Sequence, residues 1–302
     1  MNPDPASGTG VDRAWLRELI LTAGRTLESA SSRRRDLRVD RKGQVDLVTE
    51  TDLAIQEHLV QEISGAHPGD RIVAEEEDRA EGRGASVWYV DPLDGTTNFV
   101  HGHPFCAVSI ARWTDGQPDV GAVYAPLLDE LFFAVHGQGA TLERPGTGRQ
   151  ARPIHCSDCR SLDDALLGTG FPYHRGATAR LNLAICGHAL TRVQGIRRAG
   201  SAALDLCHVG LGRLDGYWEM GLGDWDVAAG ILVAREAGAV VSDFEASPDR
   251  FPVRRVAAAA PGLHPDLLAM IRAAHVQPDL EVLGPLPASP LSLVGPLPAE
   301  LP

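Results

Sequence analysis

The segment Trp88–Phe99 constrains the fold more than any other part of the sequence, because an apolar strand runs directly into two aspartates. It reads Trp-Tyr-Val-Asp-Pro-Leu-Asp-Gly-Thr-Thr-Asn-Phe. The proline and the glycine favour a tight turn, so the carboxylates of Asp91 and Asp94 can converge on one point. Together with the Leu93 carbonyl between them, they are hard oxygen ligands of the kind that Mg²⁺ accepts. Taken alone, the same residues equally fit an ordinary Asp-rich turn.

Length and composition set the broad class. The chain has 302 residues, 28 basic and 40 acidic side chains, a formal charge of −12 and 44% hydrophobic residues. These values are typical of a globular protein and exclude wholesale disorder. No apolar run approaches the roughly 18 residues that span a bilayer, and Met1–Gly10 has no signal-peptide pattern. The acidic balance without a block of basic residues argues against direct nucleic-acid binding. We therefore expect a soluble, cytoplasmic protein.

Hydrophobic spacing changes along the chain from helical to strand-like. Apolar residues at helical spacing predict a helix over Val11–Ser31, capped by Asp12, and a second helix over Thr51–Ser64. Leu53, Ile55, Leu59 and Ile63 are expected to be its buried residues. Arg71–Ala74 is predicted to be a short strand. From Val87 onward, short apolar runs separated by Gly-containing turns predict an antiparallel meander, with strands at Val87–Val90, Ala107–Ala111, Gly121–Tyr124 and Leu131–Val135.

The second half alternates helices and strands, which places the chain in the α+β class. Its predicted elements are strands at Leu166–Gly170, Leu214–Trp218 and Ala239–Ser242 and helices at Arg180–Arg192, Ala202–Leu211, Trp225–Ala237 and Pro265–His275. We expect a flexible N-terminus (1–10), a catalytic domain (11–275) with halves of about 11–148 and 149–275, and a Pro-rich tail (276–302). The segment Pro145–Pro153 is predicted to be the loop between the halves.

Cysteines and isolated acids are less informative. Five cysteines in a chain without an export signal argue against a disulfide framework, and Cys156-Ser-Asp-Cys159 is interpreted as two reduced thiols. Glu75, Glu76 and Asp226 follow or begin predicted elements, but spacing alone cannot bring them together. Lys42 is the one lysine among 28 basic side chains, which by itself fits a solvated surface equally well.

Several long segments, taken together and in order, resemble the inositol monophosphatase family of Mg²⁺-dependent, lithium-sensitive phosphatases. The resemblance covers about residues 11–275. It is carried by Trp88–Ala111 (WYVDPLDGTTNFVHGHPFCAVSIA), Trp225–Gly238 (WDVAAGILVAREAG), Lys42–Asp52 (KGQVDLVTETD), Gly200–Leu206 (GSAALDL) and Tyr217–Gly221 (YWEMG).

The resemblance implies a layered α-β-α-β-α sandwich of the inositol monophosphatase and sugar phosphatase type. It also implies two or three Mg²⁺ ions, with Glu75, Asp91 and the Leu93 carbonyl holding one and Asp91, Asp94 and Asp226 a second. Glu76 would be an alternative ligand. Two divalent ions roughly 3.5–4 Å apart can stabilise both the attacking and the leaving oxygen of an in-line displacement.

The catalytic residues that the resemblance implies are Thr96, oriented by Asp52, together with Glu75 and Lys42. In the family the threonine hydrogen-bonds the attacking water. Contacts to the organic half of the substrate are implied for a larger set, namely Asp94, Gly95, Thr96, Thr97, Gly200, Ser201, Ala202, Glu219 and Asp226. Carboxylates suit a polyol because they accept hydrogen bonds from neighbouring hydroxyls.

The expected reaction is hydrolysis of myo-inositol monophosphate to inositol and phosphate by in-line attack of a metal-activated water. Fructose 1,6-bisphosphate stays open, since Arg175, Arg197 and Arg198 could meet a second phosphate, and 3′-phosphoadenosine 5′-phosphate is a further alternative. Histidinol phosphate is disfavoured, because its branch has Gly-Gly-Asp where this chain has Gly-Ser-Ala at 200–202.

A non-catalytic or moonlighting regulator that binds protein partners is the alternative of another class, since some members of the family act on transcription. Members usually form homodimers, so a homodimer is expected here. One departure is Ala74, where many members have Gly before the Glu pair. If that position required a positive φ, alanine would cost about 1 kcal/mol.

Overall fold

The computed structural model describes residues 10–33, 39–41, 47–76, 85–172, 177–247, 251 and 254–276. Lys42, Arg175, most of the predicted N-terminal segment and nearly all of the predicted tail lie outside these ranges. The helices of the described part are α1 Arg13–Ser32, α2 Glu50–Ala66, α3 Thr96–His101, α4 Ala177–Leu190, α5 Ala202–Gly210, α6 Asp224–Glu236 and α7 His264–Val276.

Two large sheets organise the chain. The first has seven strands in the order β3-β4-β5-β6-β7-β8-β9, which are Arg71–Ala74, Ser86–Asp94, Ala107–Thr114, Gln117–Ala125, Glu130–Val135, Ala140–Arg144 and Arg149–Pro153. The second has five strands in the order β11-β10-β12-β14-β13, which are Gly195–Arg197, Leu166–Thr169, Gly216–Met220, Arg255–Ala259 and Val240–Ser242. A small sheet pairs β1 Val39–Arg41 with β2 Leu47–Thr49.

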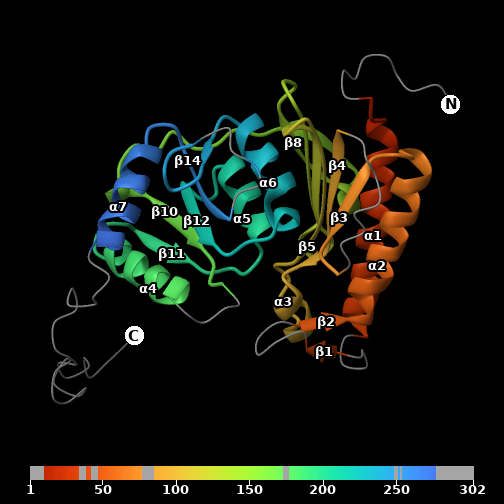
Figure 1. Ribbon diagram of the computed structural model, residues 1–302, viewed down its shortest axis with the longest axis horizontal. Coiled ribbons are helices and arrows are strands. Elements are labelled where there is room, and N and C mark those ends of the chain that lie inside the picture. Colours follow the sequence, from red (N-terminus) through yellow and green to blue (C-terminus); the bar gives the residue numbers. More distant parts are fainter. Residues whose placement is uncertain are drawn as a thin grey trace, which may run out of the picture.

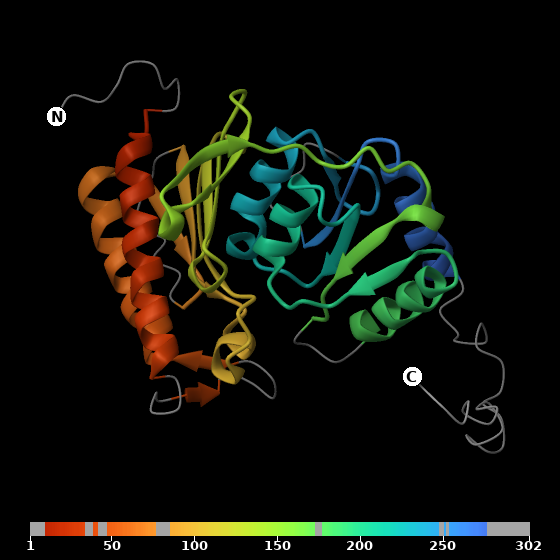
Figure 2. The same cartoon turned by 180° about the vertical axis from the view of Figure 1, so that it is seen from behind.

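The helices complete a five-layer sandwich (Figures 1 and 2). α1 and α2 pack on one face of the seven-stranded sheet, α5 and α6 lie between the two sheets, and α4 and α7 cover the outer face of the five-stranded sheet. Three hydrophobic clusters fill the spaces between neighbouring layers. The predicted layered α-β-α-β-α sandwich is therefore confirmed.

The first two helices form where the spacing predicts them, with one error in the buried face. Asp12 accepts hydrogen bonds from the N–H groups of Ala14 and Trp15 and so caps α1. In α2, Ile55, Leu59 and Ile63 are buried, whereas Leu53 is 51% exposed. Leu53 was wrongly assigned to the core, because a residue two positions before Ile55 lies on the opposite side of a helix.

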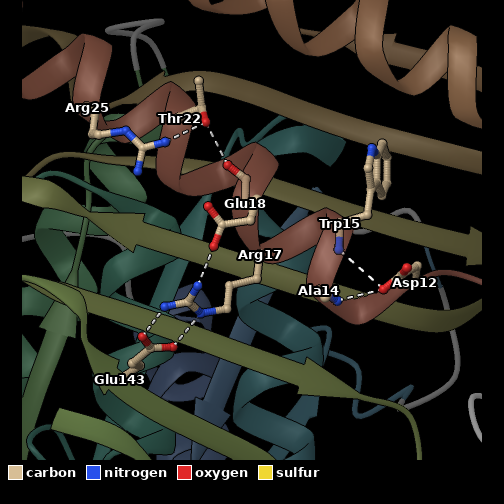
Figure 3. Close-up of polar contacts among 8 residues, drawn as sticks. All are labelled: Asp12, Ala14, Trp15, Arg17, Glu18, Thr22, Arg25 and Glu143. Carbon is tan, nitrogen blue, oxygen red and sulfur yellow. Dashed lines mark hydrogen bonds and ion pairs between the residues drawn. The ribbon is translucent and has the colours of Figure 1, made fainter. Parts of the chain in front are cut away.

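α1 is also tied to the sheet beneath it by a charged contact (Figure 3). Arg17 donates from Nε to Glu143 of β8 at 2.8 Å and makes a second, shorter contact to the same carboxylate. Paired N–H groups on one carboxylate fix its geometry. α1 is therefore held to the seven-stranded sheet by this charged contact as well as by its apolar face.

The second part of the segment Pro145–Pro153 is a strand rather than the predicted loop. Residues Arg149–Pro153 form β9, which pairs antiparallel with β8 at the edge of the seven-stranded sheet. Its side chains are exposed, so no alternation of buried and polar residues marks it in the sequence. The first half thus continues past residue 148. Sequence reasoning also missed β14 and β11 in the second sheet.

Small residues let α6 fit between its neighbours. A Cβ at Gly121 of β6 would lie 3.1 Å from the Cα of Ala229, and one at Gly230 would lie 2.8 Å from Leu206 of α5. A larger residue at either place would push α6 away from the sheet or from α5. This close packing sets the position of the α6 N-terminus.

In the described part of the chain, no helix is both long and apolar enough to cross a bilayer.

A buried carboxylate joins the two halves. Glu130 of β7 is 2% exposed and accepts hydrogen bonds from Arg144 and, through both oxygens, from Arg213 beyond α5. Burial by itself raises the pKa of Glu130, but the hydrogen bonds and positive charges of His208 and Arg213 outweigh it and lower the pKa to about 2. The ionised form is therefore favoured in the folded protein.

Because the folded-state pKa of Glu130 lies below its ordinary value of 4.5, its contribution to stability is present above about pH 4.5 and is lost as the pH falls toward 2. The full contribution is about 3 kcal/mol, of which roughly half is lost by pH 3. We expect the difference in unfolding free energy between wild type and Glu130→Gln, measured by urea denaturation, to shrink by roughly half of this contribution between pH 7 and pH 3. Exposed Glu57→Gln is the control, and an unchanged difference for Glu130→Gln would contradict the prediction.

Candidate active site

The two aspartates of the central motif are brought together by an irregularity in β4. Asp91 pairs with Ser109 and Asp94 with Ala107, so three residue steps on β4 oppose two on β5. Residues three apart on a regular strand face opposite sides, and the extra residue of a bulge corrects this. The N–H of Leu93 donates to Asp91 Oδ1 at 2.9 Å. The predicted convergence thus comes from a bulge within a strand rather than from a turn that ends it.

Asp94, the last residue of β4, contacts the N-terminus of α5, which belongs to the other half of the chain. Its Oδ2 accepts hydrogen bonds from the Ser201 hydroxyl at 2.6 Å and from the Ala203 N–H at 2.8 Å. Ser201 also caps α5 by accepting from the N–H of Leu204. A helix N-terminus favours negative charge, so this contact joins β4 to the region predicted to bind the organic half of the substrate.

Asp226 occupies the first turn of α6. Its Oδ2 accepts from the N–H of Gly223 at 2.6 Å, which fixes the carboxyl group at the start of the helix. The sequence predicts this helical position, and the packing of α6 against Gly121 then brings the helix up to the seven-stranded sheet. Asp226 is consequently close enough to raise the pKa of Asp91.

Asp52 and Thr96 form a direct pair. Thr96 Oγ1 lies 3.2 Å from Asp52 Oδ1 and 3.0 Å from the Leu93 carbonyl oxygen. Asp52 is completely buried, and its other oxygen accepts from the hydroxyl and the N–H of Thr49 in a capping box at the start of α2. The contact expected between Asp52 and Thr96 is present in the structure.

The Glu75–Glu76 pair directly follows β3, and the Glu75 charge acts on Asp91. The N–H of Glu75 donates to the Val90 carbonyl, and the N–H of Glu76 donates to the side chain of buried Gln56. Ala74 lies in β3 and is not among the residues with positive φ. Alanine therefore causes no backbone strain before the pair.

Four acids share one partly enclosed region. Burial raises the pKa of Asp91 well above its ordinary value, and the negative charges of Glu75, Asp94 and Asp226 raise it further. For Asp94, burial raises the pKa to about 6, against the lowering effect of the Ser201 and Ala203 hydrogen bonds and of the Arg198 charge. Such mutual repulsion is relieved by a bound cation.

The donor set fits a divalent cation in charge and in chemistry. Within the described residues, no three His, Cys, Asp or Glu side chains are arranged so that they could hold a metal ion as they stand. One oxygen each of Asp91, Asp94 and Asp226 is instead engaged by an N–H of the chain. Carboxylates and the Leu93 carbonyl are nevertheless the hard oxygen donors that Mg²⁺ prefers, and the repulsion of Asp91 and Asp226 by neighbouring acids favours a cation.

The residues predicted to contact the organic half of the substrate lie at the start of α5 and the end of β12. Gly200 has a φ of +92°, and a Cβ there would meet Arg198 Nη1 at 2.4 Å. Ala202 and Glu219 are buried, and Glu219 accepts a hydrogen bond from the Tyr217 hydroxyl. Burial raises the pKa of Glu219 to about 7, although the Tyr217 hydrogen bond lowers it.

Gly95 and Thr97 flank Thr96 with different surroundings. Gly95 has a φ of +91°, and a Cβ there would lie 3.0 Å from the Phe105 carbonyl and 3.2 Å from the Gly200 carbonyl, so only glycine fits. Thr97 is exposed. The structure therefore joins the central motif to the 200–203 segment, while Lys42 lies outside the described residues.

Sequence reasoning missed residues that hold these segments together. Asn98 Nδ2 donates to the carbonyls of Phe105 at 2.7 Å and Ala199 at 2.8 Å, which connects α3 to the start of α5. Gln56 and Tyr217 were missed as well. Asn98 and Tyr217 stand inside recognised segments and could have been found there, but no local pattern marks Gln56.

The chain is similar to several known proteins. A profile described as "Inositol monophosphatase family" matches residues 12–277. An inositol-1-monophosphatase of Synechocystis sp. is 40% identical over 84% of this chain and 88% of its own length. The Nus factor SuhB of Pasteurella multocida is 38% identical over 83% and 91%. The crystal structure of the extragenic suppressor protein suhB from Bartonella henselae aligns with a TM-score of 0.79 and 37% identity, covering 86% of this chain and 97% of that one.

We expect Mg²⁺ to raise the melting temperature of the protein, because a cation offsets the repulsion among the acids around Asp91. At ten times the dissociation constant the gain is about 1.4 kcal/mol, or about 3 °C for a chain of this size. Asp91→Asn should melt no lower than wild type in EDTA and should lose the response to Mg²⁺. Exposed Asp158→Asn is the control and should keep it. An equal Mg²⁺ shift in wild type and Asp91→Asn would contradict this assignment.

Proposed function

Because the chain belongs to the inositol monophosphatase family, we propose that it is a Mg²⁺-dependent phosphomonoesterase that hydrolyses myo-inositol monophosphate to inositol and phosphate. The observations that carry the proposal are the effect of the Asp94 and Asp226 charges on Asp91, and the contacts of Thr96 with Asp52 and with the Leu93 carbonyl. A cytoplasmic, lithium-sensitive homodimer is part of the same proposal.

The cation would be held by Glu75, Asp91, Asp94, Asp226 and the Leu93 carbonyl. When bound, it would neutralise phosphate charge and make a water easier to deprotonate. A phosphate monoester is doubly negative, so the acids alone would repel it. This is why we assign these carboxylates to a cation rather than to direct contact with phosphate.

The chain's own residues would orient the attacking water. Thr96 has one hydroxyl proton, and when it donates that proton to Asp52 its lone pairs are left to accept a hydrogen bond from water. Thr49 supports this orientation, since its hydroxyl and N–H both donate to Asp52 and hold the carboxyl group in place. Glu75 and Lys42 complete the proposed catalytic set.

The organic half of the substrate would lie between the start of α5 and Glu219. The segment Gly200–Ala202 offers backbone groups, and Glu219 offers a carboxylate that accepts hydrogen bonds from polyol hydroxyls. Arg198 is the nearby cation, since its charge lowers the pKa values of both Asp94 and Glu219. A second phosphate could meet it, so fructose 1,6-bisphosphate is the first alternative substrate.

A second candidate function is regulation through protein contacts. It is favoured by the relatives named Nus factor SuhB, which are up to 41% identical to this chain. One protein can both catalyse and bind a partner. Mutation of the site's acids would distinguish the two functions, because only catalysis would depend on these acids.

Phosphate release should be measured with Mg²⁺ from inositol 1-phosphate, fructose 1,6-bisphosphate, histidinol phosphate and 3′-phosphoadenosine 5′-phosphate, with and without lithium. We expect inositol 1-phosphate to be preferred and lithium to inhibit. Asp91→Asn should lower kcat more than about a hundredfold, because it weakens cation binding at the centre of the site. Asp158→Asn should leave kcat unchanged.

Preference for another ester would replace the proposed substrate and keep the chemistry. No turnover of any ester by wild type would overturn the proposed function and leave the regulatory role.

A further inference from the structure

Two glycines on β10 and its C-terminal end make room for acidic side chains between the five-stranded sheet and α5. Gly168 pairs with Tyr217 of β12, and Gly170 and Glu219 lie two residues further along each chain, on the same face. A Cβ at Gly170 would lie 2.0 Å from both carboxylate oxygens of Glu219. Glycine is therefore required for Glu219 to occupy this place.

Tyr217 lies directly behind Glu219. It is completely buried, and its hydroxyl donates a hydrogen bond to Glu219 Oε2. A phenol hydroxyl that donates a hydrogen bond to one carboxylate oxygen fixes the rotation of that carboxylate. The other oxygen is then left for a ligand. Glu219 is 9% exposed and so lies at the edge of the buried region.

The other face of the same strands is fixed by Asn182 of α4. Its Oδ1 accepts from Trp218 Nε1 at 2.7 Å, and its Nδ2 donates to the Gly170 carbonyl at 2.6 Å. Asn182 is completely buried. Asn182 thereby holds β12 and the end of β10 together beside Glu219.

Asp205 of α5 completes the arrangement and is not explained by folding. It is 1% exposed, and neither of its carboxylate oxygens has a hydrogen-bond partner in the described part of the chain. A Cβ at Gly168 would lie 3.7 Å from Asp205 Cγ and 3.3 Å from the Tyr217 ring. Burial, then the charges of Glu219 and Asp94, raise the pKa of Asp205. A buried acid without a partner costs stability, so it calls for a functional reason.

We propose that Tyr217 and Asp205 are positioning residues that hold the Glu219 carboxylate toward the substrate and thereby set selectivity for phosphate esters of polyols. Tyr217 anchors one oxygen of Glu219 by its hydrogen bond. Asp205 borders the same space over Gly168 as the Tyr217 ring, and so supports the ring whose hydroxyl holds Glu219. The inference rests on the proposed function and assigns a role to residues outside its metal site.

The test compares two substrates, myo-inositol 1-phosphate and phenyl phosphate, whose organic half has no hydroxyl groups. Tyr217→Phe removes only the hydroxyl, so we expect kcat/KM for inositol phosphate to fall about tenfold, mainly through KM, as for a lost hydrogen bond to a charged group. The value for phenyl phosphate should change less than about twofold. Tyr124→Phe, a buried tyrosine of the other sheet, is the matched control and should leave the ratio of the two values unchanged.

Coupling distinguishes positioning from simple support of the fold. Glu219→Gln should lower the same ratio, and Tyr217→Phe should add no further loss in that background, because both changes break one interaction. Asp205→Ala should lower the ratio as well, since it removes the side chain that borders the same space as the Tyr217 ring. If Tyr217→Phe does not fold, Asp205→Ala provides the test by itself.

Equal losses on both substrates in Tyr217→Phe, an unchanged ratio, or additive losses with Glu219→Gln would overturn the inference. The wild-type ratio is measured first. Wild type that does not prefer inositol phosphate would overturn both the proposed substrate and this inference. A preference that survives in Tyr217→Phe and Asp205→Ala would overturn this inference alone.

Discussion

Holding several carboxyl groups together away from water is the constraint on which the rest of the structure depends. Ionised carboxyls repel one another and lose hydration when buried, so each needs donors that are already fixed in place. Asp52, Asp91, Asp94 and Asp226 each accept a hydrogen bond from a backbone N–H. Three of these N–H groups lie at the starts of α2, α5 and α6, where helix dipoles favour negative charge, and the fourth lies in the β4 bulge.

This constraint explains why the sandwich has its particular packing. α2 carries Asp52 from one outer layer, and α5 and α6 bring the Asp94 donor and Asp226 from the layer between the sheets. Gly121 and Gly230 allow α6 to approach β6 and α5 closely. The layers that form the core therefore also position the acids. A change in the packing between these layers would move the candidate site.

Local signals predicted much of the fold. Helical spacing and caps located α1, α2, α5 and α6 to within about two residues, since helices and their caps depend on neighbouring residues. The spacing failed at Leu53, where a hydrophobic residue faces water, and at Arg149–Pro153, an exposed edge strand without an apolar pattern. Strands of this kind depend on the partner strand, which lies elsewhere in the chain.

The sequence by itself determined the family resemblance, the order of the layers that the resemblance implies and the acids that stand at the candidate site. The resemblance implied the contact of Thr96 with Asp52, and the tertiary structure shows it across 44 positions. Only the tertiary structure decided that Asp94 accepts from Ser201 and Ala203, and that Tyr217 and Asp205 lie behind Glu219. The reason is physical: burial and hydrogen-bond partners between distant segments arise from packing of whole layers, which no local spacing encodes.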